Sequence, residues 1–232
     1  MQLILAAVLI TFNWGLFIWA VNAGRTIETA LGYYITPIMV VLLGLFLFKE
    51  KLKRLQWAAL ALAFIGVLTL TILSGRPPWI SLGLAVSWSI YGLIKKTIGM
   101  PALEALAVET MLATPIGLLV IFYPAMSVFF TGVSGPGYVA ELPHITLWLL
   151  LLCGALTTTP LFLFTHAARM LPLSTLGFIQ FLSPTMSFLI GFFVFRECFP
   201  WYNFLAFCFI WSAVIMYVIS LYAAPKQKLK GA

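Results

Sequence analysis

Two stretches of the chain carry the same pattern: PIMVVLLGLFLFKE at residues 37–50 and PTMSFLIGFFVFRE at residues 184–197. In both, a glycine follows the proline by seven residues, and a basic residue and a glutamate end the stretch. Each stretch belongs to a long apolar run, so chance similarity between two apolar segments is the alternative interpretation. Because shared proline, glycine and charge positions arise by chance less easily than shared leucines, we interpret the two stretches as an internal repeat.

The composition around these stretches is that of a protein embedded in lipid. Of the 232 residues, 63% are hydrophobic and 8% are charged, whereas soluble domains average about 45–50% apolar and about 25% charged residues. So few charged side chains cannot cover a water-exposed surface, which excludes a soluble globular protein. The high apolar content excludes a disordered chain. An integral membrane protein remains.

The apolar residues fall into eight continuous runs, each of which we expect to form a membrane-spanning helix. The runs are residues 2–23, 29–48, 55–73, 79–93, 103–129, 145–168, 173–195 and 201–222. Lipid offers no partner for free backbone groups, so each run is either helical or part of a closed barrel. Barrel strands alternate polar and apolar residues over about ten positions, and these runs do not. The predicted fold class is therefore an all-α integral membrane protein.

The distribution of Lys and Arg predicts the orientation of these helices. If both chain ends lie on one side, that side holds ten of the thirteen basic residues, and the opposite side holds Arg25, Arg76 and Arg196. Because cytoplasmic loops are enriched in Lys and Arg, both termini are expected in the cytoplasm. Residues 37–50 then run inward and residues 184–197 run outward, so the repeat is inverted. Inverted repeats that meet at the membrane centre are typical of secondary transporters.

The two expected halves are unequal in length. Residues 76–232 hold five of the predicted helices, whereas residues 1–75 hold three. We therefore expect residues 1–75 to be an incomplete first repeat, from which two helices of about 25–35 residues each, with their loops, are missing before Met1.

Many short motifs resemble those of one transporter family. In the first part of the chain they are Asn13-Trp14, FIWAVN at residues 17–22, Gly24-Arg25, Glu28, LGYY at residues 31–34, Pro37 and KEKL at residues 49–52. Further along they are Gln56-Trp57, Pro78-Trp79, Ser87, YGL at residues 91–93, Lys95-Lys96, Pro160-Leu161, Phe164, Ala167-Ala168, Leu176-Gly177, Gln180-Phe181 and Pro184-Thr185. Together they resemble the RarD-like transporters of the EamA branch of the drug/metabolite transporter superfamily. The resemblance covers nearly the whole chain, and it implies a ten-helix fold of two inverted five-helix bundles in a bacterial inner membrane.

Polar side chains are costly inside a membrane, so those in the apolar runs mark candidate binding residues. The expected substrate-binding residues are Asn13, Trp14, Asn22, Tyr33, Tyr34, Trp88, Tyr91 and Gln180. For Asn13 the alternative is a hydrogen bond between helices, and for the aromatic residues it is packing or anchoring at the membrane interface. Pro37 and Pro184 are expected to kink two helices related by the repeat, close to Tyr33 and Gln180.

A second group of residues carries charge or can titrate: Arg25, Glu28, Glu109 and His166 are the expected gating or coupling residues. Arg25 and Glu28 form either an outer gate or a solvated pair that contributes little energy. Glu109 either exchanges a proton that couples transport to the proton gradient, or pairs with Lys95 or Lys96 near the cytoplasmic face. His166 is either a proton relay or a polar residue satisfied by its neighbours.

Other chemistry is not expected. The three cysteines and two histidines have no ligand-like spacing, so neither a metal site nor a cofactor is predicted. The chain lacks the GxSxG, HExxH and Walker A motifs, so we expect neither an enzyme nor an ATP-driven pump.

The sequence as a whole predicts a multi-pass transporter of the cell inner membrane that exports small metabolites or drugs by alternating access. The alternative is a truncated, transport-incompetent membrane protein or subunit. The expected partners are a small-molecule substrate, the lipid bilayer, a coupling proton and a second copy of the chain. Nucleic acid is not expected, because no basic run is interleaved with aromatic residues.

Overall fold

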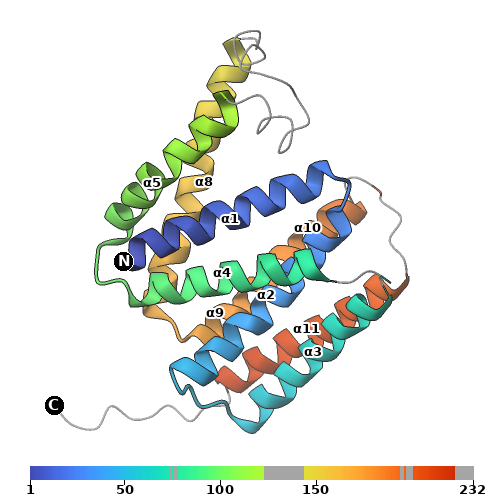
Figure 1. The fold of residues 1–232 in the computed structure, drawn as a ribbon. Helices are drawn as coiled ribbons and strands as arrows, with labels where there is room; N and C mark the ends of the chain where they lie inside the picture. The colour runs from blue at the N-terminus through green and yellow to red at the C-terminus, as the bar shows by residue number, and fades with distance from the viewer. Residues whose placement is uncertain (74, 76–77, 123–143, 194–195, 197–200, 223–232) are drawn as a thin grey trace, which may run out of the picture.

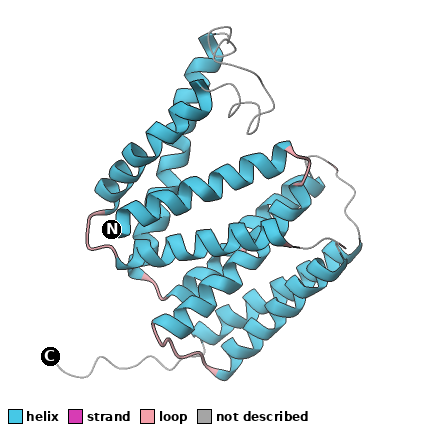
Figure 2. Cartoon of the chain, viewed as in Figure 1, coloured by secondary structure: helices cyan, strands magenta, loops and turns pink. Residues whose placement is uncertain are grey.

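The computed structural model describes residues 1–73, 75, 78–122, 144–193, 196 and 201–222. In this part of the chain the only regular elements are helices, as Figures 1 and 2 show. They are α1 (Gln2–Asn22), α2 (Thr26–Leu47), α3 (Arg54–Leu73), α4 (Trp79–Thr97), α5 (Ala102–Phe122), α8 (His144–Met170), α9 (Leu173–Gln180), α10 (Leu182–Phe193) and α11 (Trp201–Tyr222). The all-α fold class is confirmed.

The helix bounds differ from the predicted ones at two places that matter for function. The helix expected to end at residue 93 continues to Thr97, because Lys95 at its end is buried and paired instead of facing water. The run 173–195 forms two helices, α9 and α10, which part at Phe181. Residues 123–129 of the predicted fifth helix lie outside the described residues.

Pro184 accounts for the break between α9 and α10. A proline has no N–H and its ring clashes with the carbonyl four residues earlier, which here belongs to Gln180, the last residue of α9. At the break the backbone hydrogen bonding is tighter than in an α-helix: the Phe181 N–H donates to the carbonyl of Phe178, three residues earlier instead of four. Pro37, by contrast, lies inside an uninterrupted α2, so a bend there stays a prediction.

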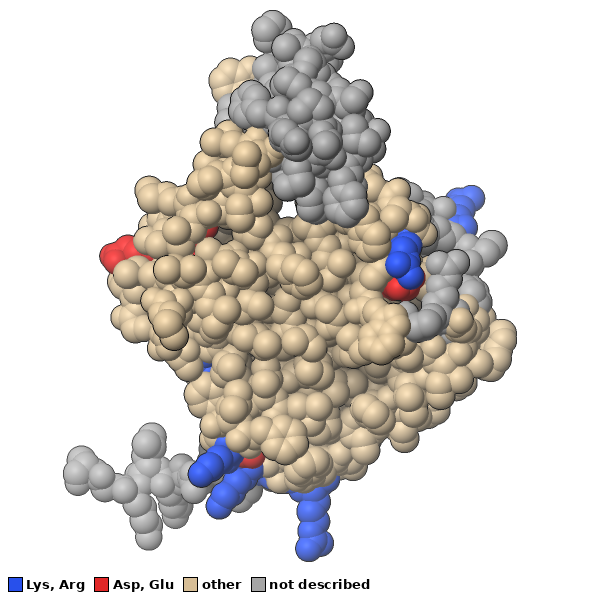
Figure 3. Space-filling model, viewed as in Figure 1, with Lys and Arg blue, Asp and Glu red and all other residues tan. Residues whose placement is uncertain are grey.

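By length and composition, six helical segments in the described residues can cross a membrane: α1, α2, α3, most of α5, the α9–α10 unit and α11. The helices α4 and α8 have 19 and 27 residues and stay predicted crossings. On the face drawn in Figure 3, uncharged side chains cover the middle and charged ones lie at the margins. This distribution suits a molecule whose middle is surrounded by lipid.

The helices pack around α2. It contacts α4 on one side and α9 on another, while α1 packs against α4 and α5, and α3 lies along α11 (Figure 1). Small residues make the contact between α3 and α11 close: Ala59, Ala63, Ala206 and Ala213 are completely buried there. Small residues serve this purpose in membranes because lipid supplies no hydrophobic force between helices, so stability depends on close packing.

The backbone shares a feature between the two repeated stretches. Lys49 has a φ of 52° and Arg196 a φ of 53°, and these are the non-glycine residues with positive φ in the described chain. The two residues occupy the same position of the repeat, directly before its closing glutamate. A left-handed conformation costs an L-residue about 1–2 kcal/mol, so its occurrence at both positions supports the repeat.

Candidate functional site

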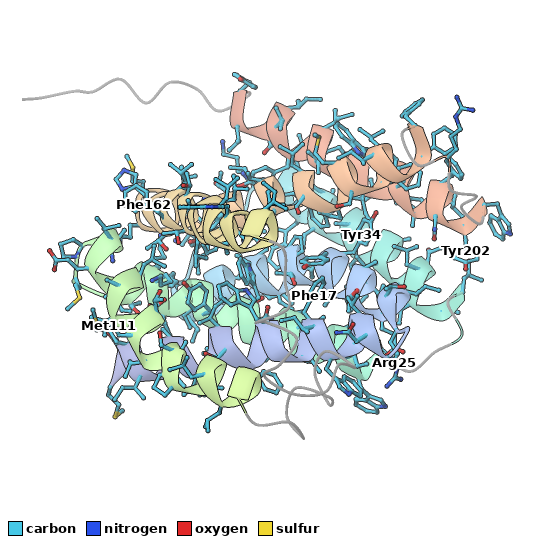
Figure 4. The ribbon with its side chains drawn as sticks, turned by 90° about the horizontal axis from the view of Figure 1, so that it is seen from above. Phe17, Arg25, Tyr34, Met111, Phe162 and Tyr202 are labelled. Atoms are coloured by element: carbon cyan, nitrogen blue, oxygen red, sulfur yellow. The ribbon has the colours of Figure 1, made fainter. Side chains whose placement is uncertain are left out.

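A partly open cavity of about 550 Å³ lies between six of the helices. It is lined by Asn13, Trp14 and Phe17 of α1; Thr29, Gly32, Tyr33 and Thr36 of α2; Leu84 and Trp88 of α4; Thr157, Pro160, Leu161 and Phe164 of α8; Gln180 of α9; and Ser183 and Pro184 of α10. Its volume is that of a pocket for a small molecule. Figure 4 shows Phe17 among the helices near the middle of the bundle, whereas Met111 and Arg25 lie toward the outside.

Aromatic rings form much of the cavity wall. Phe17 and Tyr33 meet edge to face with their ring centroids 5.9 Å apart. Between α4 and α8, the ring centroids of Trp88 and Phe164 lie 5.4 Å apart. Trp14 completes the set of aromatic lining residues. Such rings offer flat apolar faces on which a planar solute can stack.

The two amide side chains of the cavity differ in their hydrogen bonding. Asn13 donates both amide hydrogens to α4, one to the Leu84 carbonyl at 2.9 Å and one to Ser87 Oγ at 2.8 Å. The hydrogen bond between helices, which was the alternative for Asn13, is thus present, although Asn13 also lines the cavity. The Nε2 of Gln180 is buried and makes no hydrogen bond with any described residue. Gln180 itself is one of the residues that line the cavity.

The structure brings six of the predicted binding or kink residues to the cavity: Asn13, Trp14, Tyr33, Trp88, Gln180 and Pro184. It places others elsewhere. Asn22 is exposed and donates to the Ile18 carbonyl of its own helix. Tyr34 packs against the hydrophobic core between α2, α3 and α11. Tyr91 and Pro37 are completely buried and are not among the lining residues.

The sequence did not identify several apolar and small lining residues. On α2 they are Thr29, Gly32 and Thr36, which share one helix face with Tyr33 through spacings of three and four residues. On α8 the same spacing joins Thr157, Pro160, Leu161 and Phe164. Extending the helix face from Tyr33 would have found the lining residues of α2, whereas on α8 no predicted site residue lines the cavity.

Arg25 and Glu28 form an ion pair at the start of α2, with Arg25 Nε 2.8 Å from Glu28 Oε1. The pair is not fully solvated, because the Glu28 side chain is only 2% exposed. The backbone carbonyl of Glu28 also accepts a hydrogen bond from Ser81 Oγ of α4. A carboxylate in the first turn interacts favourably with the helix dipole. Neither residue of the pair is among the described lining residues, although Thr29, the residue after Glu28, is.

Glu109 of α5 lies in a buried polar cluster with α4. Lys95 Nζ is 2.8 Å from Glu109 Oε1, and the Tyr91 hydroxyl donates to Glu109 Oε2 at 3.1 Å. Lys95 is fully buried and Glu109 is 3% exposed. The alternative of pairing with Lys95 is therefore observed, but inside the protein and not at a solvated face. Tyr91 lies 5.8 Å from Trp88, ring to ring, which connects this cluster to the cavity wall.

His166 is not one of the described residues that line the cavity. His166 is exposed, and its ring stacks on Phe162 at 6.4 Å. Within the described segments, no group of three or more His, Cys, Asp or Glu side chains could hold a metal ion.

Comparison with known proteins places the chain in a family. Residues 1–72 match the model of the EamA-like transporter family. The chain is 41% identical to protein RarD of Streptomyces exfoliatus, over 91% of this chain and 65% of that protein. It is 39% identical to the uncharacterized transporter YojE of Bacillus subtilis (strain 168), over 95% of this chain and 71% of that protein. It is also 39% identical to protein RarD of Escherichia coli (strain K12), over 99% of this chain and 75% of that protein. No solved structure matches significantly.

The fold and these similarities define the class of the protein, which is a multi-pass membrane transporter. The chain is a RarD-like member of the EamA family, and it spans about two thirds to three quarters of the length of these curated relatives.

Proposed function

We propose that the chain is a secondary transporter that exports small solutes across the cell inner membrane by alternating access. The observation that carries the proposal is the cavity, because helices of both predicted halves enclose it. Residues 1–75 contribute α1 and α2 to its wall, and residues 76–232 contribute α4, α8, α9 and α10. In an inverted-repeat transporter, a shared central site of this kind is exposed to either side as the halves rock.

The lining chemistry favours an uncharged, aromatic substrate. The lining residues named above include five aromatic side chains and no charged one. A charged solute would find no counter-charge among these lining residues, and the cation–π energy of a ring, about 2 kcal/mol or more when desolvated, is small against the desolvation of an ion. The free Nε2 of Gln180 would donate to a carbonyl or hydroxyl oxygen of the solute.

A gradient supplies the energy in this proposal, since the sequence has no Walker A motif. A proton is the proposed coupling ion. Both termini face the cytoplasm in the proposed orientation, which follows from the excess of basic residues on their side.

Flux through proteoliposomes tests the proposal. The purified chain is reconstituted, a proton gradient is imposed, and the flux of uncharged aromatic amides is compared with that of charged aromatic solutes of the same size. We expect gradient-dependent flux of the uncharged compounds and little flux of the charged ones. Absence of gradient-dependent flux for every solute would contradict transport by this chain, whereas faster flux of the charged compounds would contradict only the substrate class.

A further inference from the structure

Two charged side chains from earlier in the chain, Glu50 and Lys96, make hydrogen bonds to the turn between α8 and α9. On one side, Glu50, which follows the end of α2, accepts hydrogen bonds at both carboxylate oxygens. The Leu173 N–H donates to Oε1 at 2.7 Å and the Ser174 N–H donates to Oε2 at 2.9 Å. These are the first two N–H groups of α9, which have no partner within their own helix.

On the other side, Lys96 of α4 holds the end of α8. Its Nζ donates to the carbonyl of Ala168 at 3.1 Å and to that of Leu171 at 2.5 Å. The same Nζ lies 5.6 Å from the ring centroid of Phe48, the C-cap of α2. A lysine at this position satisfies carbonyls that the end of a helix leaves free.

Both charges match the dipoles of the helices that they contact. A carboxylate is stabilised at a helix N-terminus and an ammonium group at a helix C-terminus. Arg169, in the last turn of α8, adds a third contact, since its Nε donates to the Lys95 carbonyl at 3.3 Å. Charge-assisted hydrogen bonds of this kind are stronger than neutral ones.

The backbone around Glu50 is shaped for this contact. Lys49 takes a left-handed conformation with a φ of 52°, which turns the chain back toward α2, and the Glu50 N–H donates to the Gly44 carbonyl. A Cβ on Gly44 would lie 2.9 Å from Glu50 Oε2 and 3.0 Å from the Cβ of Leu173. Glycine at position 44 therefore leaves room for the carboxylate against α9.

The held turn lies at the end of α2 away from the cavity. The cavity-lining residues of α2 fall within residues 29–36. Further along the helix, Val40 and Val41 are buried, and Val40 packs with Ala168, Leu173 and Leu176 in one apolar cluster. The cavity is thus closed toward the turn by packing between α2, α8 and α9.

We propose that Glu50 and Lys96 are positioning residues that form a latch on the α8–α9 turn, and that this latch must release before the cavity opens toward the face where the turn lies. The proposal rests on the proposed function, because it assigns a closed gate to one state of the transport cycle. The hydrogen bonds of Glu50 to the start of α9 and of Lys96 to the end of α8 join residues far apart in sequence. Such contacts can be formed in one conformation and absent in another.

Cysteine accessibility tests the latch. In a chain whose native cysteines 153, 198 and 208 are replaced by serine, single cysteines are introduced as Val40→Cys behind the latch and Thr36→Cys in the cavity. A membrane-impermeant thiol reagent is applied to each face of the reconstituted vesicles in turn. In Glu50→Gln and in Lys96→Met, we expect labelling of Val40→Cys from the face of the turn to rise about tenfold, the shift that loss of charge-assisted hydrogen bonds produces. Labelling of Thr36→Cys from the opposite face should fall.

Two controls separate a latch from general loosening. The variant Ala213→Cys reports on the packed contact between α3 and α11, where Ala213 is completely buried, and its labelling should stay unchanged. Lys51→Gln removes a neighbouring exposed charge and should change none of the reporters. Unchanged labelling of Val40→Cys in both latch variants would overturn the proposal, as would an equal rise at Val40→Cys and Ala213→Cys. Because labelling needs no transported solute, the latch and the proposed function can fail independently.

Discussion

At the scale of single residues, the two amide side chains that line the cavity differ in whether their N–H groups are hydrogen-bonded to the protein. Asn13 uses both donor hydrogens to fix α1 to α4, whereas Gln180 Nε2 has no partner among the described residues. A buried donor that is left unsatisfied costs about 1–3 kcal/mol, which a ligand acceptor would recover on binding. The two amides should therefore respond differently to the same substitution.

We expect Gln180→Leu to weaken binding of an acceptor-bearing solute about five- to tenfold while leaving the melting temperature unchanged or slightly higher. Asn13→Leu should lower the melting temperature, because it breaks two hydrogen bonds between α1 and α4. Solute binding by tryptophan fluorescence and thermal unfolding in detergent measure the two effects. Equal loss of stability in both variants would contradict this division of roles.

The buried pair of Lys95 and Glu109 leads to a second prediction. Removing one partner of a buried ion pair leaves an uncompensated charge and costs about 3–5 kcal/mol. Lys95→Met and Glu109→Leu should therefore each be strongly destabilising, whereas the double variant Lys95→Met/Glu109→Leu should be more stable than Lys95→Met alone. Unfolding by denaturant in micelles measures all three, and additive losses in the double variant would show that the pair is not coupled.

At the scale of elements, the contact between α2 and α9 depends on the small size of Gly177. A Cβ at this position would lie 2.7 Å from the Pro37 carbonyl oxygen and 2.7 Å from Val41 Cγ2. Both neighbours are buried, and one of them is backbone, so neither can move aside freely. The enclosed Pro37 of α2 thus serves close helix packing in this structure.

Gly177→Ala should destabilise the chain by about 1–3 kcal/mol through overpacking between α2 and α9. The matched control is Gly117→Ala in α5, where nothing lies within 4 Å of the added Cβ. That control should be neutral or stabilising by up to about 1 kcal/mol, because alanine favours a helix more than glycine does. Thermal unfolding in detergent compares the two, and equal stability would show that α9 can shift without cost.

At the scale of the whole molecule, orientation in the membrane is the property on which direction of transport depends. Thr26 begins α2 and Lys51 follows its end, so the two positions lie at opposite ends of one predicted crossing. In a chain without native cysteines, Lys51→Cys should react with an impermeant thiol reagent only from the cytoplasmic side and Thr26→Cys only from the outer side. Labelling of intact cells and of inverted vesicles measures both, and the reverse pattern would place the termini outside.

The sequence identified six of the sixteen residues that line the cavity, and Tyr33 and Tyr34 show why it identified no more. The two neighbours differ by about 100° around the axis of α2, so one lines the cavity and the other packs into the core. In a soluble protein an apolar stripe would indicate which helix face points inward. A helix in lipid is apolar on every side, so the rotation of α2 becomes visible only when its neighbours are in place.

The sequence by itself determined the environment, the class of fold, most helix bounds and a disturbance of the helix at Pro184, which the structure shows as a break between α9 and α10. These properties depend on composition and on the chemistry of single backbone positions, which act over a few residues. Only the tertiary structure decided which helix faces meet: that Lys95 lies against Glu109, that Asn13 bonds to α4, and that Glu50 holds the start of α9, 123 residues further along the chain. Contacts of this kind depend on close packing of surfaces distant in sequence, where the exact shape of neighbouring side chains sets the pairing and no local pattern records it.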